Sequence, residues 1–163
     1  KEYWKALLHV NPNEASHIAV FVKRSNEIKS EITQQDPNEH SVRKKLNYGH
    51  TIGHAIESFF LSKSDPITHG NAVGWGIIFE NRIAIKLGLM EDSLASIIES
   101  RILDIFGPLP IFNAEEIQEI LHFMQNDKKN KNGVFHFSLV QKIGDCLIQV
   151  EVTEEIAREV ISV

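Results

Sequence analysis

The chain has 163 residues and a net charge of −5. Hydrophobic residues make up 42% and charged residues 24%, a balance that supports a buried core and excludes a disordered chain. The acidic charge argues against a nucleic-acid partner, and no apolar run approaches the roughly 20 residues of a membrane span. The single cysteine, Cys146, excludes an intrachain disulfide and a cysteine-rich metal site. We therefore expect a reducing compartment and a cytoplasmic protein.

The first third of the chain predicts long helices. Residues 1–8 are typical of the end of a helix, and apolar residues then recur at helical spacing over 12–34. Two tetrapeptides, NPNE at 11–14 and DPNE at 36–39, each offer an N-cap, a proline at the first helical position and a glutamate at the third. The second tetrapeptide predicts one continuous helix that runs to about residue 61.

The remaining segments predict shorter elements. Three signals predict where these elements end: Gly88, the pair Gly107-Pro108 and the polar run 126–133. The expected helices cover 68–87, 93–106 (capped by Asp92 or Ser93), 114–125 and 154–161, and two strands cover 134–140 and 146–152. The sequence thus predicts a mainly α protein, a single multi-helix domain over residues 1–163 with a small β-hairpin near its end.

The stretch RKKLNYGHTIGHAIES, residues 43–58, carries an unusual polar stripe. On one continuous helix, five polar residues share an arc of about 80°: Arg43, Asn47, His50, His54 and Glu57. An amphipathic helix with a solvated face is the ordinary alternative, but such a face is usually rich in Lys and Glu. This set instead favours a metal or an oxygen-rich ligand. Gly49 and Gly53 lie beside the stripe, where missing side chains would let another helix approach closely.

Histidines four positions apart on a helix can reach one metal ion, so His50 and His54 form a candidate pair. Two ligands do not make a tight site, and His69, which precedes the next apolar helix, is the best further candidate in the chain. A role for His69 as a helix-cap residue is the alternative. Glu39 fits either a general base or a capping glutamate.

Basic residues lie in segments near this stripe in sequence: Lys29, Arg43, Lys128 and Lys129. Each alone is an ordinary solvated charge, but together with a metal they would suit a substrate that bears carboxylate and phosphate groups. No P-loop, dinucleotide-binding glycine motif or nucleophile elbow is present, so a complete nucleotide site within this chain is not expected.

Four segments together resemble the 3-dehydroquinate synthase family. In order, they are RSNEIK (24–29), DPNEHSVRKKLNYGHTIGHAIE (36–57), HGNAV (69–73) and NDKKNKNG (126–133). They cover nearly the whole chain and correspond to the family's C-terminal helical half. The chain departs from the family pattern at three positions, where Pro37 and Ser41 replace a common glutamate and glycine, and Asn71 replaces a glutamate.

The resemblance implies a role for each matched residue. His50 and His69 match two of the family's three protein ligands to zinc, a site that another divalent ion such as Co²⁺ would also suit. His54 matches a histidine implicated in proton transfer, and Glu39 matches a proposed proton acceptor. Residues implied to bind the substrate, a phosphorylated sugar acid, are Lys29, Arg43, Asn47 and one lysine of the pair Lys128 and Lys129.

The family reaction converts 3-deoxy-arabino-heptulosonate 7-phosphate to 3-dehydroquinate and phosphate, in the shikimate pathway of aromatic amino acid biosynthesis. It begins with oxidation of a hydroxyl by NAD. The resemblance implies that the third zinc ligand, a glutamate, and the NAD-binding N-terminal domain precede Lys1, and that the full-length enzyme is a homodimer. We therefore expect this chain to be a piece of a longer protein and to be inactive alone.

Two other classes of function stay open on the sequence. One is a related sugar-phosphate cyclase or a metal-dependent polyol dehydrogenase of the same fold. Lys29 and the NDKK turn argue against the dehydrogenase, because a neutral polyol needs no anion clamp. The other is a non-catalytic helical zinc-binding module, against which the missing third ligand argues.

Overall fold

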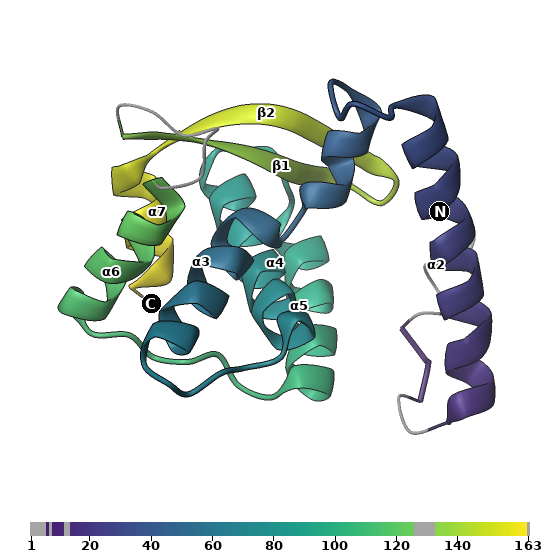
Figure 1. The fold of residues 1–163 in the computed structure, drawn as a ribbon, viewed down its shortest axis with the longest axis horizontal. Helices are drawn as coiled ribbons and strands as arrows, with labels where there is room; N and C mark the ends of the chain where they lie inside the picture. The colour runs from purple at the N-terminus through teal and green to yellow at the C-terminus, as the bar shows by residue number, and fades with distance from the viewer. Residues whose placement is uncertain (1–5, 7, 12–13, 126–132, 163) are drawn as a thin grey trace. The chain divides into compact units, whose positions relative to one another are not determined.

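The structure is a computed structural model that describes residues 6, 8–11, 14–125 and 133–162. The chain divides into two compact units, Lys1–Leu46 and Asn47–Val163. The elements that the structure describes are mostly helices, followed by a two-stranded antiparallel hairpin and a last short helix (Figure 1). The predicted mainly α fold with a late hairpin is therefore confirmed. None of the described helices is both long enough and apolar enough to cross a membrane.

In the first unit, helix α2 (Ala15–Gln35) is followed by a tight loop and the 3₁₀-helix η1 (Val42–Asn47). The buried side chain of Asp36 organises this loop, because it accepts hydrogen bonds from the backbone N–H groups of His40, Ser41 and Arg43 at 2.9, 2.7 and 3.0 Å. These bonds lower the pKa of Asp36 to about 2, although burial alone would raise it.

The helix starts predicted at 12 and 37 are not the ones that the described residues show. Glu14, expected three positions into the helix, is instead the N-cap residue of α2 and makes no side-chain capping bond. Pro12 and Asn13 lie outside the described residues. The backbone N–H of Asp36 donates to the carbonyl of Ile32, and Glu39 has a positive φ of 56°, so Glu39 does not cap a helix.

The continuous helix predicted from residue 36 to about 61 is also wrong. Gly49 has a φ of +81°, a left-handed conformation that interrupts a regular helix, and α3 (His50–Ser62) begins only after it. Arg43 and Asn47 belong to η1, whose three residues per turn give a different angular spacing. Of the predicted stripe, only His50, His54 and Glu57 share one α-helix.

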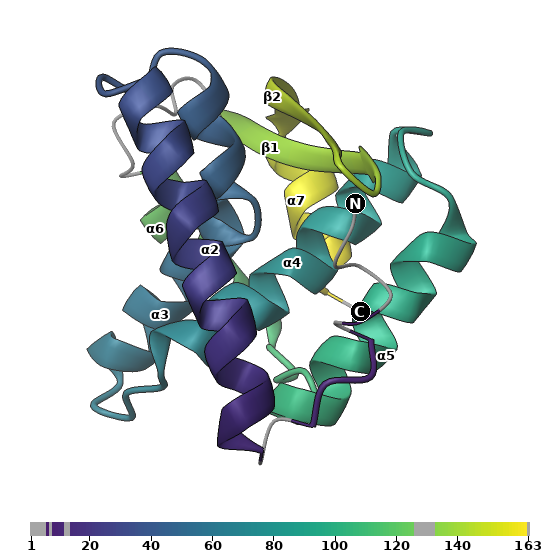
Figure 2. The ribbon, with the colours of Figure 1, turned by 90° about the vertical axis from the view of Figure 1, so that its right-hand side faces the viewer.

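The second unit is built around α4 (His69–Lys86), which contacts α3, α5 (Asp92–Phe106), β1 and α7. α6 (Ala114–Gln125) packs on α3 and on α7 (Glu154–Ile161). β1 (Val134–Lys142) and β2 (Asp145–Thr153) form a twisted ribbon that lies along one side of these helices in both views (Figures 1 and 2). Fully buried side chains fill the space between: Ile52, Ile56, Ile78, Phe79, Ile83, Ile120, Leu121, Phe135 and Leu139.

Local signals in the sequence account for most helix boundaries of this unit. Asn113 and Glu116 form a reciprocal capping box at α6, since the Asn113 side chain accepts from the Glu116 N–H while the Glu116 carboxylate accepts from the Asn113 N–H. Thr68 and Thr153 cap α4 and α7 through their hydroxyls. α5 differs from the prediction, because its N-cap residue is Glu91.

Candidate metal centre

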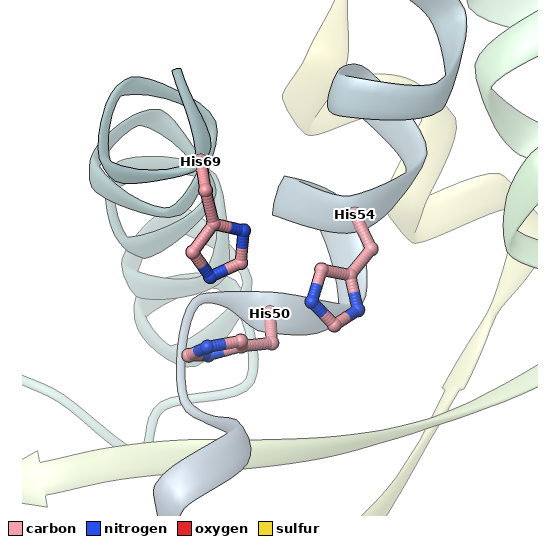
Figure 3. Close-up of side chains that lie close together, drawn as sticks. All are labelled: His50, His54 and His69. Atoms are coloured by element: carbon pink, nitrogen blue, oxygen red, sulfur yellow. The ribbon is translucent and has the colours of Figure 1, made fainter.

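Three histidines converge in the second unit. His50 is the first residue of α3, His54 lies one turn later, and His69 is the first residue of α4. One ring nitrogen of each lies within 4.8 Å of the corresponding nitrogens of the other two, and the ring centroids are 5.1 to 5.5 Å apart. Figure 3 shows the three rings turned toward one another from the two helices. The pairing of His69 with the other two histidines links segments that sequence spacing alone does not join.

Glycines bring α3 and α4 close enough for this arrangement. A Cβ atom on Gly76 would lie 2.1 Å from the carbonyl oxygen of Gly49, and one on Gly53 would lie 3.0 Å from the carbonyl oxygen of Ala72. Only a residue without a side chain fits at Gly76 in this arrangement. The predicted role of Gly49 and Gly53 in a close helix approach is confirmed, and Gly76 is the partner that sequence analysis did not single out.

Two of the histidines have one ring nitrogen already engaged. The Nδ1–H of His50 donates to the carbonyl oxygen of Tyr48 at 3.1 Å, and the Nδ1–H of His69 donates to the carboxylate of Glu57 at 3.0 Å. A carbonyl and an ionised carboxylate only accept, so each ring carries its proton on Nδ1 and presents the Nε2 lone pair. Carboxylate and carbonyl partners of this kind orient histidine ligands in many metal sites.

The donor set fits a divalent transition metal. Imidazole nitrogens suit zinc and neighbouring ions such as cobalt. Zn–N bonds of about 2.0–2.1 Å require two donors on one ion to lie at most about 4.2 Å apart, so separations of up to 4.8 Å have to shorten when an ion binds. His54 and His69 are exposed and His50 is half-buried, which leaves the cluster accessible to a substrate from solvent.

A buried carboxylate lies behind the cluster. Glu80 of α4 has no exposed surface and accepts hydrogen bonds from the backbone N–H groups of Gly49, Thr51 and Ile52 at 2.7, 3.0 and 3.3 Å. Burial raises the pKa of Glu80, whereas the three hydrogen bonds from N–H groups lower it by favouring the ionised form. The next residue, Asn81, accepts a 2.5 Å hydrogen bond from the hydroxyl of Tyr48. Sequence analysis identified neither Glu80 nor Asn81.

The sequence does hold a signal for Glu80. Its neighbours three and four positions away in α4 are Gly76, Ile77, Ile83 and Ala84. A charged residue surrounded on its own helix face by apolar and small residues is buried, and a buried charge needs dedicated partners.

The other predicted site residues belong to the first unit, to η1 or to the part of the chain outside the described residues. Lys29, Glu39 and Arg43 belong to the first unit, where Lys29 is exposed and Arg43 lies 3.9 Å from Glu39 and donates to the carbonyl of Pro37. Asn47 is half-buried at the end of η1. Lys128 and Lys129 lie outside the described residues. Within the second unit, the structure brings together the three histidines of the predicted site.

Asn71, which departs from the family pattern, has a local role here. Its backbone N–H donates to the Thr68 hydroxyl, and that hydroxyl donates to the Asn71 side-chain oxygen at 2.6 Å. Asn71 thus completes the cap of α4, the helix that begins with His69. The departure leaves the start of that helix intact.

Comparison with known proteins identifies the family of this chain. The family model described as 3-dehydroquinate synthase C-terminal matches residues 1–130. The 3-dehydroquinate synthase of Parabacteroides distasonis is 35% identical over 150 residues, which are 91% of this chain and 42% of that protein. The enzyme of Rippkaea orientalis is 36% identical over 160 residues, 98% of this chain and 43% of that protein. The chain therefore belongs to the 3-dehydroquinate synthase C-terminal family.

The chain spans under half the length of these curated relatives. Among solved structures, 2-deoxy-scyllo-inosose synthase complexed with carbaglucose-6-phosphate, NAD⁺ and Co²⁺ is similar, with a TM-score of 0.59 and 27% identity. That similarity covers 71% of this chain and 34% of the solved one. The fold is thus shared in part with 2-deoxy-scyllo-inosose synthase.

Proposed function

We propose that this chain is the metal- and substrate-binding part of a 3-dehydroquinate synthase. Its full-length parent would convert 3-deoxy-arabino-heptulosonate 7-phosphate to 3-dehydroquinate and phosphate, in the shikimate pathway. The observation that carries the proposal is the convergence of His50, His54 and His69, which come from two of the four segments that resemble the family, 36–57 and 69–73. Because the chain spans under half of its relatives, we propose that it does not complete turnover alone.

The metal of this proposal is a divalent ion, zinc or cobalt, held by the Nε2 atoms of His50 and His69. Such an ion supplies Lewis-acid chemistry, by holding substrate oxygens and polarising a carbonyl. The Co²⁺ in the related inosose synthase complex supports a divalent ion of this kind. Glu57 would fix the His69 ring, and the Tyr48 carbonyl would fix the His50 ring.

His54 is proposed to move a proton rather than to hold the metal. Its ring is exposed and lies with its centroid 5.1 Å from that of His50, within reach of a substrate bound at the cluster. Histidine suits this task because its unperturbed pKa lies near neutrality. His54 also lies close enough to serve as a third ligand, so the two roles need separate tests.

The remaining roles follow from the family. Lys29, Arg43, Asn47 and a lysine of Lys128 and Lys129 are proposed to bind the carboxylate, hydroxyls and phosphate of the substrate. Glu39 is proposed as a proton acceptor. NAD would be bound mainly by the N-terminal domain of the parent, which we propose to be a cytoplasmic homodimer. The NAD⁺ in the related inosose synthase complex supports the use of this cofactor.

The decisive experiment is an assay of the full-length parent with NAD⁺ and Zn²⁺ or Co²⁺. We expect phosphate release and a cyclised product from 3-deoxy-arabino-heptulosonate 7-phosphate. Glucose 6-phosphate, the natural counterpart of the carbaglucose-6-phosphate ligand, serves as the competing substrate. Turnover of glucose 6-phosphate alone would replace the synthase by the second candidate, an inosose-type cyclase, which the shared fold favours.

Calorimetric titration with Zn²⁺ measures the affinity that distinguishes either enzyme from a non-catalytic zinc-binding module. If a glutamate of the parent supplies the third protein ligand, this chain binds Zn²⁺ far more weakly than the parent does. Equally tight one-to-one binding by the chain would assign the third position to His54 and would support the module.

A further inference from the structure

The start of α3 is held by α4 through several contacts that meet at His50. Glu80 accepts from the N–H of Gly49, immediately before His50, and from the N–H groups of Thr51 and Ile52, immediately after it. Oε2 of Glu80 accepts from the N–H of Gly49, and Oε1 accepts from the N–H groups of Thr51 and Ile52. The backbone on both sides of His50 is therefore fixed by one side chain.

The same segment is held at two neighbouring points of α4. Asn81 accepts from the hydroxyl of Tyr48, whose carbonyl in turn accepts from the His50 ring. Gly76, one turn before Glu80, lets the α4 backbone lie against the carbonyl of Gly49. Residues 48–52, which we call the His50 anchor, thus contact α4 at Gly76, Glu80 and Asn81.

This arrangement exceeds what a helix start requires. Exposed serine, threonine, aspartate or asparagine normally satisfies the free N–H groups at a helix start. Here a distant glutamate, 30 positions from His50 and without exposed surface, does so instead. Burying a carboxylate is costly, so its placement beside a ligand candidate calls for a role beyond capping. The left-handed Gly49 also permits the turn that puts the Tyr48 carbonyl within reach of the His50 ring.

We propose that Glu80 is a positioning residue of the metal centre: by fixing the His50 anchor on α4, its carboxylate sets the orientation and tautomer of the His50 ring relative to His69. The inference rests on the proposed metal site. It adds a residue that lies outside the histidine cluster and acts through the backbone, and it makes α4 the carrier of both His69 and the support for His50.

Glu80→Gln tests this proposal with little change in size. A glutamine has one acceptor oxygen, and its NH₂ group faces N–H donors, so the variant cannot keep all three bonds. The matched control is Glu99→Gln, which removes a carboxylate that also bonds to α4, through Arg82 at 2.8 Å, away from the His50 anchor. Each protein is titrated with Co²⁺, and its absorption spectrum and dissociation constant are recorded.

We expect Glu80→Gln to weaken Co²⁺ binding about tenfold or more and to alter the Co²⁺ spectrum, with the control unchanged. A spectrum and affinity equal to those of the unaltered chain would overturn the inference. If neither the unaltered chain nor its full-length parent takes up Co²⁺, the proposed metal site is wrong and the inference falls with it, so the two failures are distinguishable.

A metal-free measurement provides a second reading. Nitrogen-15 spectra of the imidazole rings at about pH 8, where an ordinary histidine of pKa about 6.5 is neutral, report which nitrogen carries the proton. We expect His50 to carry it on Nδ1 in the unaltered chain and to lose that preference in Glu80→Gln. If Glu80→Gln does not fold, Tyr48→Phe, which removes the bond to Asn81, is measured instead. An unchanged His50 tautomer and Co²⁺ affinity in Tyr48→Phe would then overturn the proposal.

Discussion

Glu57 and His69 form a hydrogen-bonded pair whose value lies in orientation rather than in stability. Their side chains are 35% and 54% exposed, and exposed pairs contribute at most about 1 kcal/mol. The 3.0 Å bond nevertheless decides which nitrogen of His69 presents its lone pair. Partners of this kind change metal affinity by roughly 10- to 100-fold when they are removed.

We therefore expect Glu57→Gln to bind Zn²⁺ at least about tenfold more weakly while its melting temperature stays nearly unchanged. Isothermal calorimetry and circular dichroism measure the two quantities. Glu119→Gln is the control, because that carboxylate forms a similarly exposed pair with Lys63. His50→Ala sets the lower limit, since it should abolish zinc binding with little loss of fold. Equal affinities for Glu57→Gln and Glu119→Gln would refute the orienting role.

Asp36 makes the loop 36–43 sensitive to acid. Its folded pKa of about 2 lies below the ordinary value of about 3.9. For such a lowered pKa, the stabilisation is fully present above the ordinary value and is lost as the pH falls through about 2.

Acid titration followed by NMR should therefore move the backbone amide signals of His40, Ser41 and Arg43 together, with a midpoint close to pH 2. Asp36→Asn should remove this shared transition and shift the three signals already at neutral pH. A midpoint near the ordinary carboxyl value would show that the three hydrogen bonds do not hold the ionised form.

The crossing of α3 and α4 depends on a single missing side chain. Replacement of Gly76 by alanine should destabilise the chain by about 2 kcal/mol or more, because the new methyl group meets backbone atoms that cannot move independently. Gly70→Ala is the control in the same helix, since its nearest neighbour, Phe106, lies 3.6 Å from the added Cβ.

Urea unfolding of both variants measures this difference, and we expect Gly70→Ala to be neutral or slightly stabilising. Gly76→Ala should also lose Zn²⁺ affinity, because His69 and His50 lie on the two helices that it forces apart. Equal unfolding free energies for the two variants would contradict the role assigned to this crossing.

Sequence patterns predicted helices well where the signal is local. The pair Asn113 and Glu116 predicts the start of α6, and Thr153 predicts the start of α7. In the structure these residues cap those two helices. The predicted helix over 36–61 failed because its decisive contacts are not local. Asp36 turns its side chain onto the amides of a loop, and Gly49 takes a left-handed conformation that Glu80, 31 positions away, holds in place.

The sequence predicted the candidate histidines of the site, but not the groups that hold their rings in place. Histidines four apart on one face pointed to His50 and His54, and a position just before the next apolar helix pointed to His69. The partners that fix the rings, the Tyr48 carbonyl and the Glu80 carboxylate, depend on where α4 crosses α3. No periodicity within either helix encodes that crossing, although the glycines mark where it occurs.

The core of the molecule lies entirely in one of its two units. Every residue of the buried hydrophobic cluster in the described part of the chain falls between Ile52 and Ile161. The histidine cluster and Glu80 belong to the same unit, Asn47–Val163. The hydrophobic core described here is therefore built within residues 47–163.

A variant that spans only residues 47–163 should fold cooperatively, with a melting temperature within about 5 °C of the whole chain, a change of roughly 1 kcal/mol. Circular dichroism follows the melting, and Co²⁺ titration checks the histidine cluster. The complementary piece, residues 1–46, should show no cooperative transition. Loss of the sigmoidal transition in the longer piece would place essential core contacts in the first unit.

The short separation of the three histidines has a consequence for how the protein is made. His50 and His69 are 19 positions apart, and both lie on the α3–α4 pair joined by a short loop. Closing a chain segment costs only about 0.6 kcal/mol more per doubling of its length, and short segments close first. We expect the α3–α4 pair to form while the ribosome is still synthesising the hairpin. The nascent chain would then present the histidine cluster before its hydrophobic core is complete. A metal ion bound at that stage would stabilise the α3–α4 pair, on which the later elements pack.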